Sequence, residues 1–301
     1  MSLRPGTTLS ALAVLCFSVS FAAQGAGGGA GHPVVSDPPA VDRGFPPGME
    51  GVQIPSGDAT MNGQMYVANG PGPHPTVLLL HGFPGDEKSL DLARALQRAG
   101  FNILFFHYRG AWGSGGTYSL PGQVEDVKAA LVFLRQPEVA EQFRVDPTRL
   151  MTVGHSLGGF NALITGVEDP EIICTVAMAP ANLGASMARS LEGEPPPGVN
   201  VPVNGLAGYT SASLAREIAE GQPRFDVAAR MGAMSGRPLL IVSADKDATA
   251  TPERVAALAD AARAAGVSPF DHVVLDGDHS FNWTRVELSR VIVDWTTEHC
   301  M

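Results

Sequence analysis

The sequence predicts an α/β fold, in which helices cover both faces of a mostly parallel sheet. From residue 76 onward, short apolar runs alternate with segments of helical periodicity. The apolar runs are continuous, as in strands that are buried on both faces of a parallel sheet. The chain has 301 residues, of which 45% are hydrophobic, so it can bury a sizeable core. We therefore expect one large domain over residues 49–301.

The N-terminal segment has the pattern of an export signal. Arg4 supplies a positive charge, Leu9 to Phe21 form an apolar run, and the small residues of SFAAQGA suit cleavage. The apolar run is short for a membrane span, which makes an N-terminal anchor the less favoured alternative. We expect residues 1–23 to be a signal peptide and the Gly- and Pro-rich residues 24–48 to be a flexible lead-in. The mature protein would then be periplasmic or secreted, without stable membrane insertion.

The elements expected after the lead-in follow a regular order. Residues 51–55 and 61–68 suit an antiparallel hairpin at one edge of the sheet, because they carry strand-like patterns joined by a short turn. Buried strands and amphipathic helices then alternate. The expected strands are 76–82, 101–108, 149–155, 172–180, 237–245 and 270–278, and the expected helices are 86–100, 121–136, 156–167, 251–266 and 280–299.

Residues 181–236 interrupt this alternation. The stretch EGEPPPGVNVPVNG contains too much Pro and Gly for a strand, whereas SASLAREIAEGQ suits a helix. Ligands of open α/β sheets bind at the carboxyl ends of the strands. The insertion directly follows the expected strand 172–180, so it begins at that edge. We expect a cap over the sheet edge, with a disordered loop as the alternative.

The charge balance excludes several classes of function. The formal net charge is −10, the pI is near 5.2, and Lys and Arg form no run, so the chain lacks the basic surface that nucleic-acid binding requires. There is no H-E-x-x-H motif, and the histidines lack metal-ligand spacing. We therefore expect that the protein binds no nucleic acid, and that it uses neither a metal nor an organic cofactor.

Two cysteines would remain after removal of the signal. An oxidising compartment permits a disulfide between them. However, Cys174 lies in an apolar strand-like run and Cys300 is the penultimate residue. We expect a buried thiol at Cys174 and a frayed one at Cys300, with a disulfide as the alternative.

The pentapeptide Gly-His-Ser-Leu-Gly at residues 154–158 fits the G-x-S-x-G pattern of a nucleophile elbow. By itself the pattern is weak in a chain that contains 35 glycines. Its context is more specific, because it follows an expected strand and opens an expected helix, as the elbow requires. Ser156 is therefore predicted to be a nucleophile rather than a helix N-cap serine.

A serine nucleophile needs a base and an acid that orients the base. His279 follows the last expected strand and completes the order Ser, Asp, His. For the acid, SADKDATATP offers Asp247, which we favour, and Asp245 as the alternative. An aspartate here could instead cap the next helix, but spacing favours Thr251 for that position.

Donors for an oxyanion are expected from two backbone amides. One belongs to Leu157, directly after the nucleophile, and the other to Phe83 in the loop HGFPG after the first parallel strand. The side chain of Phe83 would line the acyl pocket. A purely structural turn is the alternative for HGFPG.

Together, HGFPG, YRGAWGSGG, GHSLGG, SADKDATATP and GDHSF stand in the order and at the strand ends of the α/β-hydrolase fold family. Residues 50–298 resemble a capped member. The resemblance implies that HGFPG is the oxyanion segment, GHSLGG the elbow and His279 the catalytic histidine. FFHYRGAWGSGG is similar to a loop of prolyl-oligopeptidase-like and serine-aminopeptidase-like branches and of many carboxylesterases.

The expected function is that of an exported serine hydrolase, which cleaves a carboxylic ester of a small-molecule acyl substrate through an acyl-enzyme. A serine peptidase of the same fold is one alternative. If it engaged a free amine it would need acidic pocket residues, for which Glu192 and Glu194 in the insertion are candidates. A non-catalytic binding protein on this fold is the other alternative.

Overall fold

The structure is a computed structural model that describes residues 31–184, 202–220 and 223–301. The expected signal peptide, the start of the lead-in and the central part of the insertion, with Glu192 and Glu194, lie outside the described residues. No helix within the described ranges is long and apolar enough to cross a membrane.

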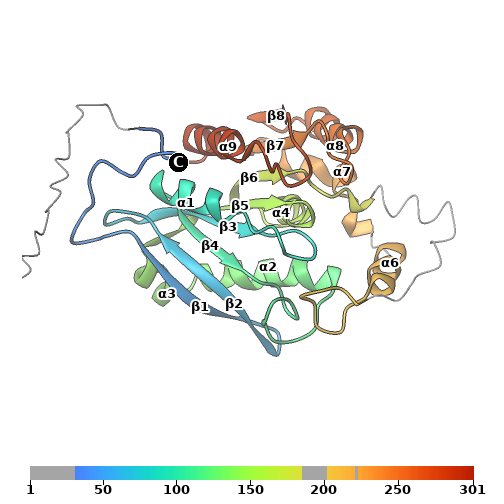
Figure 1. The fold of residues 1–301 in the computed structure, drawn as a ribbon, viewed down its shortest axis with the longest axis horizontal. Coiled ribbons are helices and arrows are strands. Elements are labelled where there is room, and N and C mark those ends of the chain that lie inside the picture. Colours follow the sequence, from blue (N-terminus) through green and yellow to red (C-terminus); the bar gives the residue numbers. More distant parts are fainter. Residues whose placement is uncertain (1–30, 185–201, 221–222) are drawn as a thin grey trace, which may run out of the picture.

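The core of the fold is an eight-stranded sheet with the order β1-β2-β4-β3-β5-β6-β7-β8 (Figure 1). β1 pairs with β2 in an antiparallel hairpin, β2 pairs antiparallel with β4, and every other pairing is parallel. The α/β fold and the edge hairpin expected from the sequence are therefore confirmed. The strands are β1 Gly48–Ser56, β2 Ala59–Val67, β3 His74–Leu80, β4 Asn102–Phe106, β5 Val145–His155, β6 Ile172–Met178, β7 Leu239–Ala244 and β8 Phe270–Leu275.

Helices cover both faces of the sheet. Neighbouring residues of a strand point to opposite faces, so each central strand contributes side chains to two apolar clusters. Val77 and Leu79 of β3 belong to one apolar cluster together with α1 and α9, whereas Leu78 and Leu80 belong to a second cluster with α2 and α3. The helices are α1 Leu90–Arg98, α2 Leu120–Leu134, α3 Pro137–Phe143, α4 Leu157–Glu168, α6 Ser211–Ala219, α7 Val227–Arg230, α8 Pro252–Ala264 and α9 Arg285–His299.

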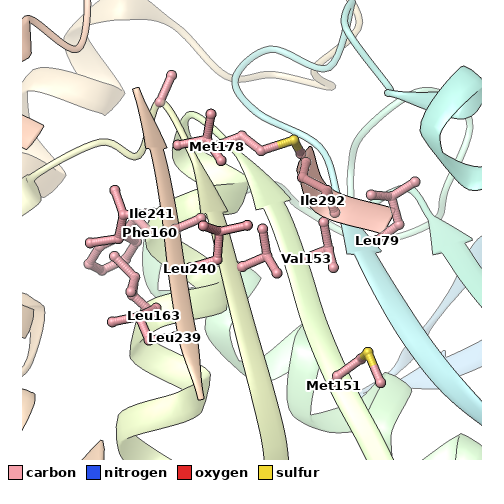
Figure 2. Packing of buried hydrophobic residues seen from close by; sticks show 14 of the residues in the cluster. Leu79, Met151, Val153, Phe160, Leu163, Met178, Leu239, Leu240, Ile241 and Ile292 are labelled. Atoms are coloured by element: carbon pink, nitrogen blue, oxygen red, sulfur yellow. The ribbon is translucent and has the colours of Figure 1, made fainter. Parts of the chain in front are cut away.

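Three adjacent parallel strands form the centre of the first cluster. Figure 2 shows Leu79 of β3, Val153 of β5 and Met178 of β6 near Ile292 of α9. All four side chains are fully buried or nearly so. This packing fixes the strands whose carboxyl ends carry the loops of the candidate site.

The chain departs from the expected elements in several places, for example in β5, which begins at Val145 rather than at residue 149. The short helix α3 follows α2 directly and was not expected. α9 begins at Arg285 rather than at residue 280, because residues 278–284 form consecutive turns, with N–H groups of Phe281 and Thr284 bonded to Asp278 and Phe281 carbonyls. The lead-in over residues 31–47 has no helix or strand, yet Arg98 donates to the Val34 carbonyl at 3.0 Å and holds it on the surface.

Hydrogen bonds attach the described parts of the insertion to the main domain at two places. Glu217 of α6 accepts hydrogen bonds from the backbone N–H of Leu120 at 2.9 Å and from the hydroxyl of Tyr209 at 2.6 Å. Further along, Arg224 and Arg230 donate to Glu168 at the end of α4, at 2.9 and 3.1 Å. These contacts join the insertion to helices α2 and α4 of the main domain.

The expectation of two free thiols is wrong, because Cys174 and Cys300 form a disulfide. α9 packs against β6, which places Cys300 directly over Cys174 with their Cα atoms 5.9 Å apart. Cys300 is accordingly buried rather than frayed. The sequence separation of 126 residues means that the bond closes most of the second half of the chain into a loop.

Replacement of Cys300 by serine should lower the free energy of unfolding by about 2–4 kcal/mol, because a crosslink that closes a long loop restricts the unfolded chain. Denaturant titrations of the wild-type protein and Cys300→Ser would measure the difference. In excess dithiothreitol the two proteins should unfold at nearly the same denaturant concentration. Equal stability without reductant would contradict the disulfide.

Candidate active site

Three loops at the carboxyl edge of the sheet bring together residues that lie far apart in the sequence. Ser156 follows β5, Asp247 follows β7 and His279 follows β8. Because parallel strands end at the same edge, their loops converge there. The structure therefore brings together the three residues that the sequence analysis assigned to nucleophile, acid and base.

Hydrogen bonds join these three side chains in a line. His279 Nδ1 lies 2.7 Å from Asp247 Oδ2, and His279 Nε2 lies 2.9 Å from Ser156 Oγ. A carboxylate only accepts, so the imidazole proton resides on Nδ1 and the Nε2 lone pair faces the serine hydroxyl. This is the arrangement that allows an imidazole to take the proton of a serine.

The carboxylate of Asp247 is completely buried and has further partners on its other oxygen. Oδ1 accepts the backbone N–H groups of Thr249 at 2.7 Å and Ala250 at 2.8 Å. Three hydrogen bonds thus compensate the burial of a negative charge and fix its orientation toward His279. Thr251 is at the N-cap position of α8, as its spacing predicts, although its side chain makes no capping hydrogen bond.

Asp245, the alternative acid, points elsewhere. Its Oδ1 accepts the backbone N–H of Gly277 at 3.1 Å and a hydrogen bond from Lys246 Nζ at 3.3 Å. Its side chain is about half exposed, unlike that of Asp247. Asp245 therefore connects the loop after β7 to the loop after β8 and does not contact His279.

Ser156 has a strained backbone conformation, with φ +56° and ψ −117°. Its N–H donates to the Met178 carbonyl at 2.9 Å and its carbonyl accepts from Phe160 at 3.1 Å, so strand and helix both hold it. A side chain at Gly154 would collide with the Gly158 carbonyl, and one at Gly158 would collide with the Leu80 carbonyl. The two glycines of the motif are thus required by the close approach of strand, turn and helix.

The loop HGFPG after β3 passes directly beside the serine. A Cβ atom built on Gly82 would lie 2.9 Å from Ser156 Cβ and 3.5 Å from its Oγ. Leu157 is the first residue of α4, so its N–H has no acceptor within the helix. The positions of both segments suit the two predicted oxyanion donors, the amides of Phe83 and Leu157, whose role stays a prediction.

Trp112 holds this loop in place. Its indole Nε1–H donates to the Pro84 carbonyl at 2.8 Å, and its backbone N–H donates to the Gly205 carbonyl of the insertion at 2.8 Å. A side chain at Gly85 would collide with the Trp112 ring. The loop containing YRGAWGSGG therefore connects the predicted oxyanion segment to the insertion.

A cavity of about 420 Å³ opens beside the serine and the histidine. Most of its described wall is apolar, and helix α6 of the insertion contributes Leu214 and Ile218. Arg254 is the one Asp, Glu, Lys or Arg side chain of the described wall. The lining residues are Phe83, Leu120, Ser156, Leu157, Pro180, Ala181, Asn182, Leu183, Leu214, Ile218, Thr249, Ala250, Arg254 and His279.

Three other histidines adjoin strand ends near the site, and burial lowers the pKa of each. The pKa falls to about 3 at His81, and to about 4 at His107 and at His155. For His155 the adjacent His279 adds to the effect of burial. These imidazoles are neutral at physiological pH and are weak bases compared with an ordinary histidine.

Within the described ranges, no group of three or more His, Cys, Asp or Glu side chains is placed to hold a metal ion. The arrangement of Asp247, His279 and Ser156 suits proton transfer and nucleophilic attack by the serine.

Sequence patterns did not identify three contributors to the site. These are the clamp by Trp112, the two α6 side chains in the cavity wall, and a contact between His155 and the backbone of His279. The helix 211–219 was expected, but no local signal indicates which surface it covers. His155 lies inside the elbow motif, at a position where the G-x-S-x-G pattern accepts any residue. The pattern therefore assigns no role to its side chain.

Comparisons with known proteins show which family model and which proteins this chain resembles. The family model described as BD-FAE matches residues 65–178, which include the loop after β3 and the serine. An uncharacterized protein from Mycobacterium tuberculosis, MT2364, is 28% identical over 247 residues, covering 79% of this chain and 78% of that protein.

Two solved structures share the fold. The Pyrococcus furiosus esterase Pf2001 is 20% identical, with a TM-score of 0.62 over 88% of this chain and 100% of that chain. Est1E from Butyrivibrio proteoclasticus, in a structure with bound ferulic acid, is 17% identical, with a TM-score of 0.66 over 82% of this chain and 98% of that chain. Because both proteins are at most 20% identical to this chain, the comparison shows a shared fold and nothing finer.

Substitution of the two aspartates should separate their roles. Asp247→Asn should lower kcat for an activated ester by roughly 10³–10⁴-fold, because an amide at this position favours the wrong imidazole tautomer. Asp245→Asn should change kcat by less than about fivefold, since Asp245 does not contact the imidazole. Steady-state kinetics with p-nitrophenyl butyrate would measure both, and a larger loss in the Asp245 variant would reverse the assignment.

Proposed function

The chain belongs to the α/β-hydrolase fold family, and on that premise we propose that it is an exported serine hydrolase that cleaves carboxylic esters of small-molecule acyl substrates. The observation that carries this proposal is the line of hydrogen bonds from the buried Asp247 through His279 to Ser156, at 2.7 and 2.9 Å. The line ends at a cavity that can accept an acyl chain.

In the first half of the proposed reaction, Ser156 Oγ attacks the ester carbonyl carbon while its proton passes to His279 Nε2. The buried Asp247 carboxylate stabilises the imidazolium that results. The N–H groups of Phe83 and Leu157 would bind the negatively charged oxygen of the tetrahedral intermediate. A donor of this kind is worth about 3–4 kcal/mol of transition-state stabilisation.

The intermediate then collapses. His279 returns its proton to the departing alcohol oxygen, the carbon–oxygen bond breaks, and an acyl-enzyme remains on Ser156. A water molecule gives a proton to His279 Nε2 and attacks the acyl carbonyl. The second collapse releases the carboxylic acid and restores the serine hydroxyl.

The cavity wall favours an ester over a substrate with a free amine. A free ammonium group would require a carboxylate near the serine, and the described wall has an arginine, Arg254, and no Asp or Glu. Glu192 and Glu194, the candidates for such a role, lie outside the described residues. The bulk of the described wall is apolar, which suits a hydrocarbon acyl group.

Export is supported by two independent features. The first residues carry the charged, apolar and small-residue segments of a signal peptide. The Cys174–Cys300 disulfide suits an oxidising compartment, because cytosolic thiols are kept reduced. Both features favour the periplasm or the extracellular space as the site of action.

A fluorophosphonate probe should label the mature protein at Ser156, and Ser156→Ala should not be labelled. Such probes react with a serine that an adjacent imidazole activates. Mass spectrometry of the labelled peptide would identify the residue. A folded wild-type protein that stays unlabelled would contradict the proposal.

The same preparations distinguish ester from peptide cleavage. The wild-type protein should hydrolyse p-nitrophenyl acyl esters with many turnovers and should leave aminoacyl p-nitroanilides nearly untouched. A higher kcat/KM for the anilides would favour a peptidase. Turnover limited to one equivalent of ester would favour a binding protein.

Expression of the full-length chain in a bacterial host with an intact export pathway should yield a mature protein in the periplasm or medium that lacks about the first 23 residues, in keeping with a cleaved signal. Intact-mass analysis would find the cleavage site. An unprocessed protein in the cytosolic fraction, with free thiols at Cys174 and Cys300 in addition to Cys16, would exclude export.

A further inference from the structure

The residue that precedes the nucleophile has a side chain placed to act on the base. His155 is the last residue of β5 and pairs in register with Met178 of β6. Its side chain is almost fully buried. It therefore lies under the site and does not line the cavity.

The imidazole of His155 bonds to the backbone of His279. Its Nε2 lies 2.7 Å from the His279 carbonyl oxygen, and the two rings are 4.9 Å apart, centre to centre. A carbonyl only accepts, so His155 Nε2 carries a proton and donates it. Phe281 packs edge-on against the same imidazole at 6.4 Å.

The protonation state of His155 agrees with this role. Burial and the neighbouring His279 lower its pKa to about 4, so the ring is neutral in the range where an imidazole base works. Arg285 also disfavours its charged form, whereas Asp247 favours it. A neutral ring has one N–H, which the His279 carbonyl places on Nε2, and Nδ1 has no hydrogen-bond partner among the described residues.

The loop that carries His279 is a series of turns without helix or strand. Residues 276–284 lie between β8 and α9, and Phe281 has φ +55°. Asp245 and Lys246 bond to the backbone of Gly277, at the start of the loop. The bond from His155 is made at His279 itself, to the same residue whose ring must reach both Asp247 and Ser156.

We propose that His155 is a positioning residue, which holds His279 at bonding distance from Ser156 through its hydrogen bond to the His279 carbonyl. The inference rests on the proposed hydrolase function. His155 is covalently adjacent to Ser156, so one peptide unit, the His155 side chain and one hydrogen bond connect the backbone of the nucleophile to the backbone of the base. A shift of either residue relative to the other would strain or break this bond.

Three substitutions of His155 separate the hydrogen bond from packing. The amide nitrogen of glutamine can stand near the position of Nε2, that of asparagine reaches only the position of Nδ1, and leucine cannot donate. With p-nitrophenyl butyrate, His155→Asn and His155→Leu should lower kcat by about 10–100-fold, with KM within about threefold, because a small displacement of a catalytic group is costly. His155→Gln should recover most of kcat.

His272→Asn is the matched control. His272 is a half-buried histidine whose Nε2, like that of His155, bonds to a neighbour, Ser243 Oγ at 2.9 Å, but it lies on β8 away from the site. Its substitution should leave kcat within about twofold of wild type, even if the thermal midpoint falls. Thermal unfolding of every variant would show that the kinetic changes come from folded protein.

Three outcomes would overturn the proposal: equal losses of kcat in all three His155 variants, no loss in any of them, or a change confined to KM. Hydrogen–deuterium exchange of the peptide spanning residues 277–284 provides a readout that does not need activity. Exchange should be faster in the Asn and Leu variants than in the Gln variant and wild type. If the wild-type protein does not react with esters or fluorophosphonates, the proposed function fails, while the exchange data still decide whether His155 holds the loop.

Discussion

The hydrogen bond between the buried Asp247 carboxylate and His279 is the interaction on which the candidate site depends. It places the proton on Nδ1 and so directs the Nε2 lone pair at Ser156. A buried carboxylate would be costly without partners, and the N–H groups of Thr249 and Ala250 supply them. The acid is therefore oriented by the backbone of its own loop before any substrate binds.

The elbow imposes a second constraint, because the strained backbone of Ser156 persists only where the surroundings hold it. Its N–H is bonded to β6 and its carbonyl to the first turn of α4. The parallel pairing of β5 with β3 and β6 fixes the strand from which the turn begins. Packing in the centre of the sheet thus determines where the hydroxyl of Ser156 lies.

The insertion contributes side chains to the cavity beside this elbow. α6 contributes part of the cavity wall, and Glu217 attaches that helix to the N-terminus of α2. Trp112 bonds both to the loop after β3 and to the insertion. A change in the insertion would therefore affect the shape of the cavity and the loop with the predicted oxyanion donor at the same time.

The sequence by itself determined the α/β fold, the edge hairpin and the meeting of Ser156 and His279 with one of two candidate aspartates at the carboxyl edge, because apolar periodicity and the elbow motif are local signals. Tertiary structure decided which of the two aspartates faces His279, the late start of α9, the Cys174–Cys300 bond and the contact of His155 with the His279 carbonyl. These features join segments up to 126 residues apart. Their partners are set by the packing of helices and loops on the sheet, which no local pattern encodes.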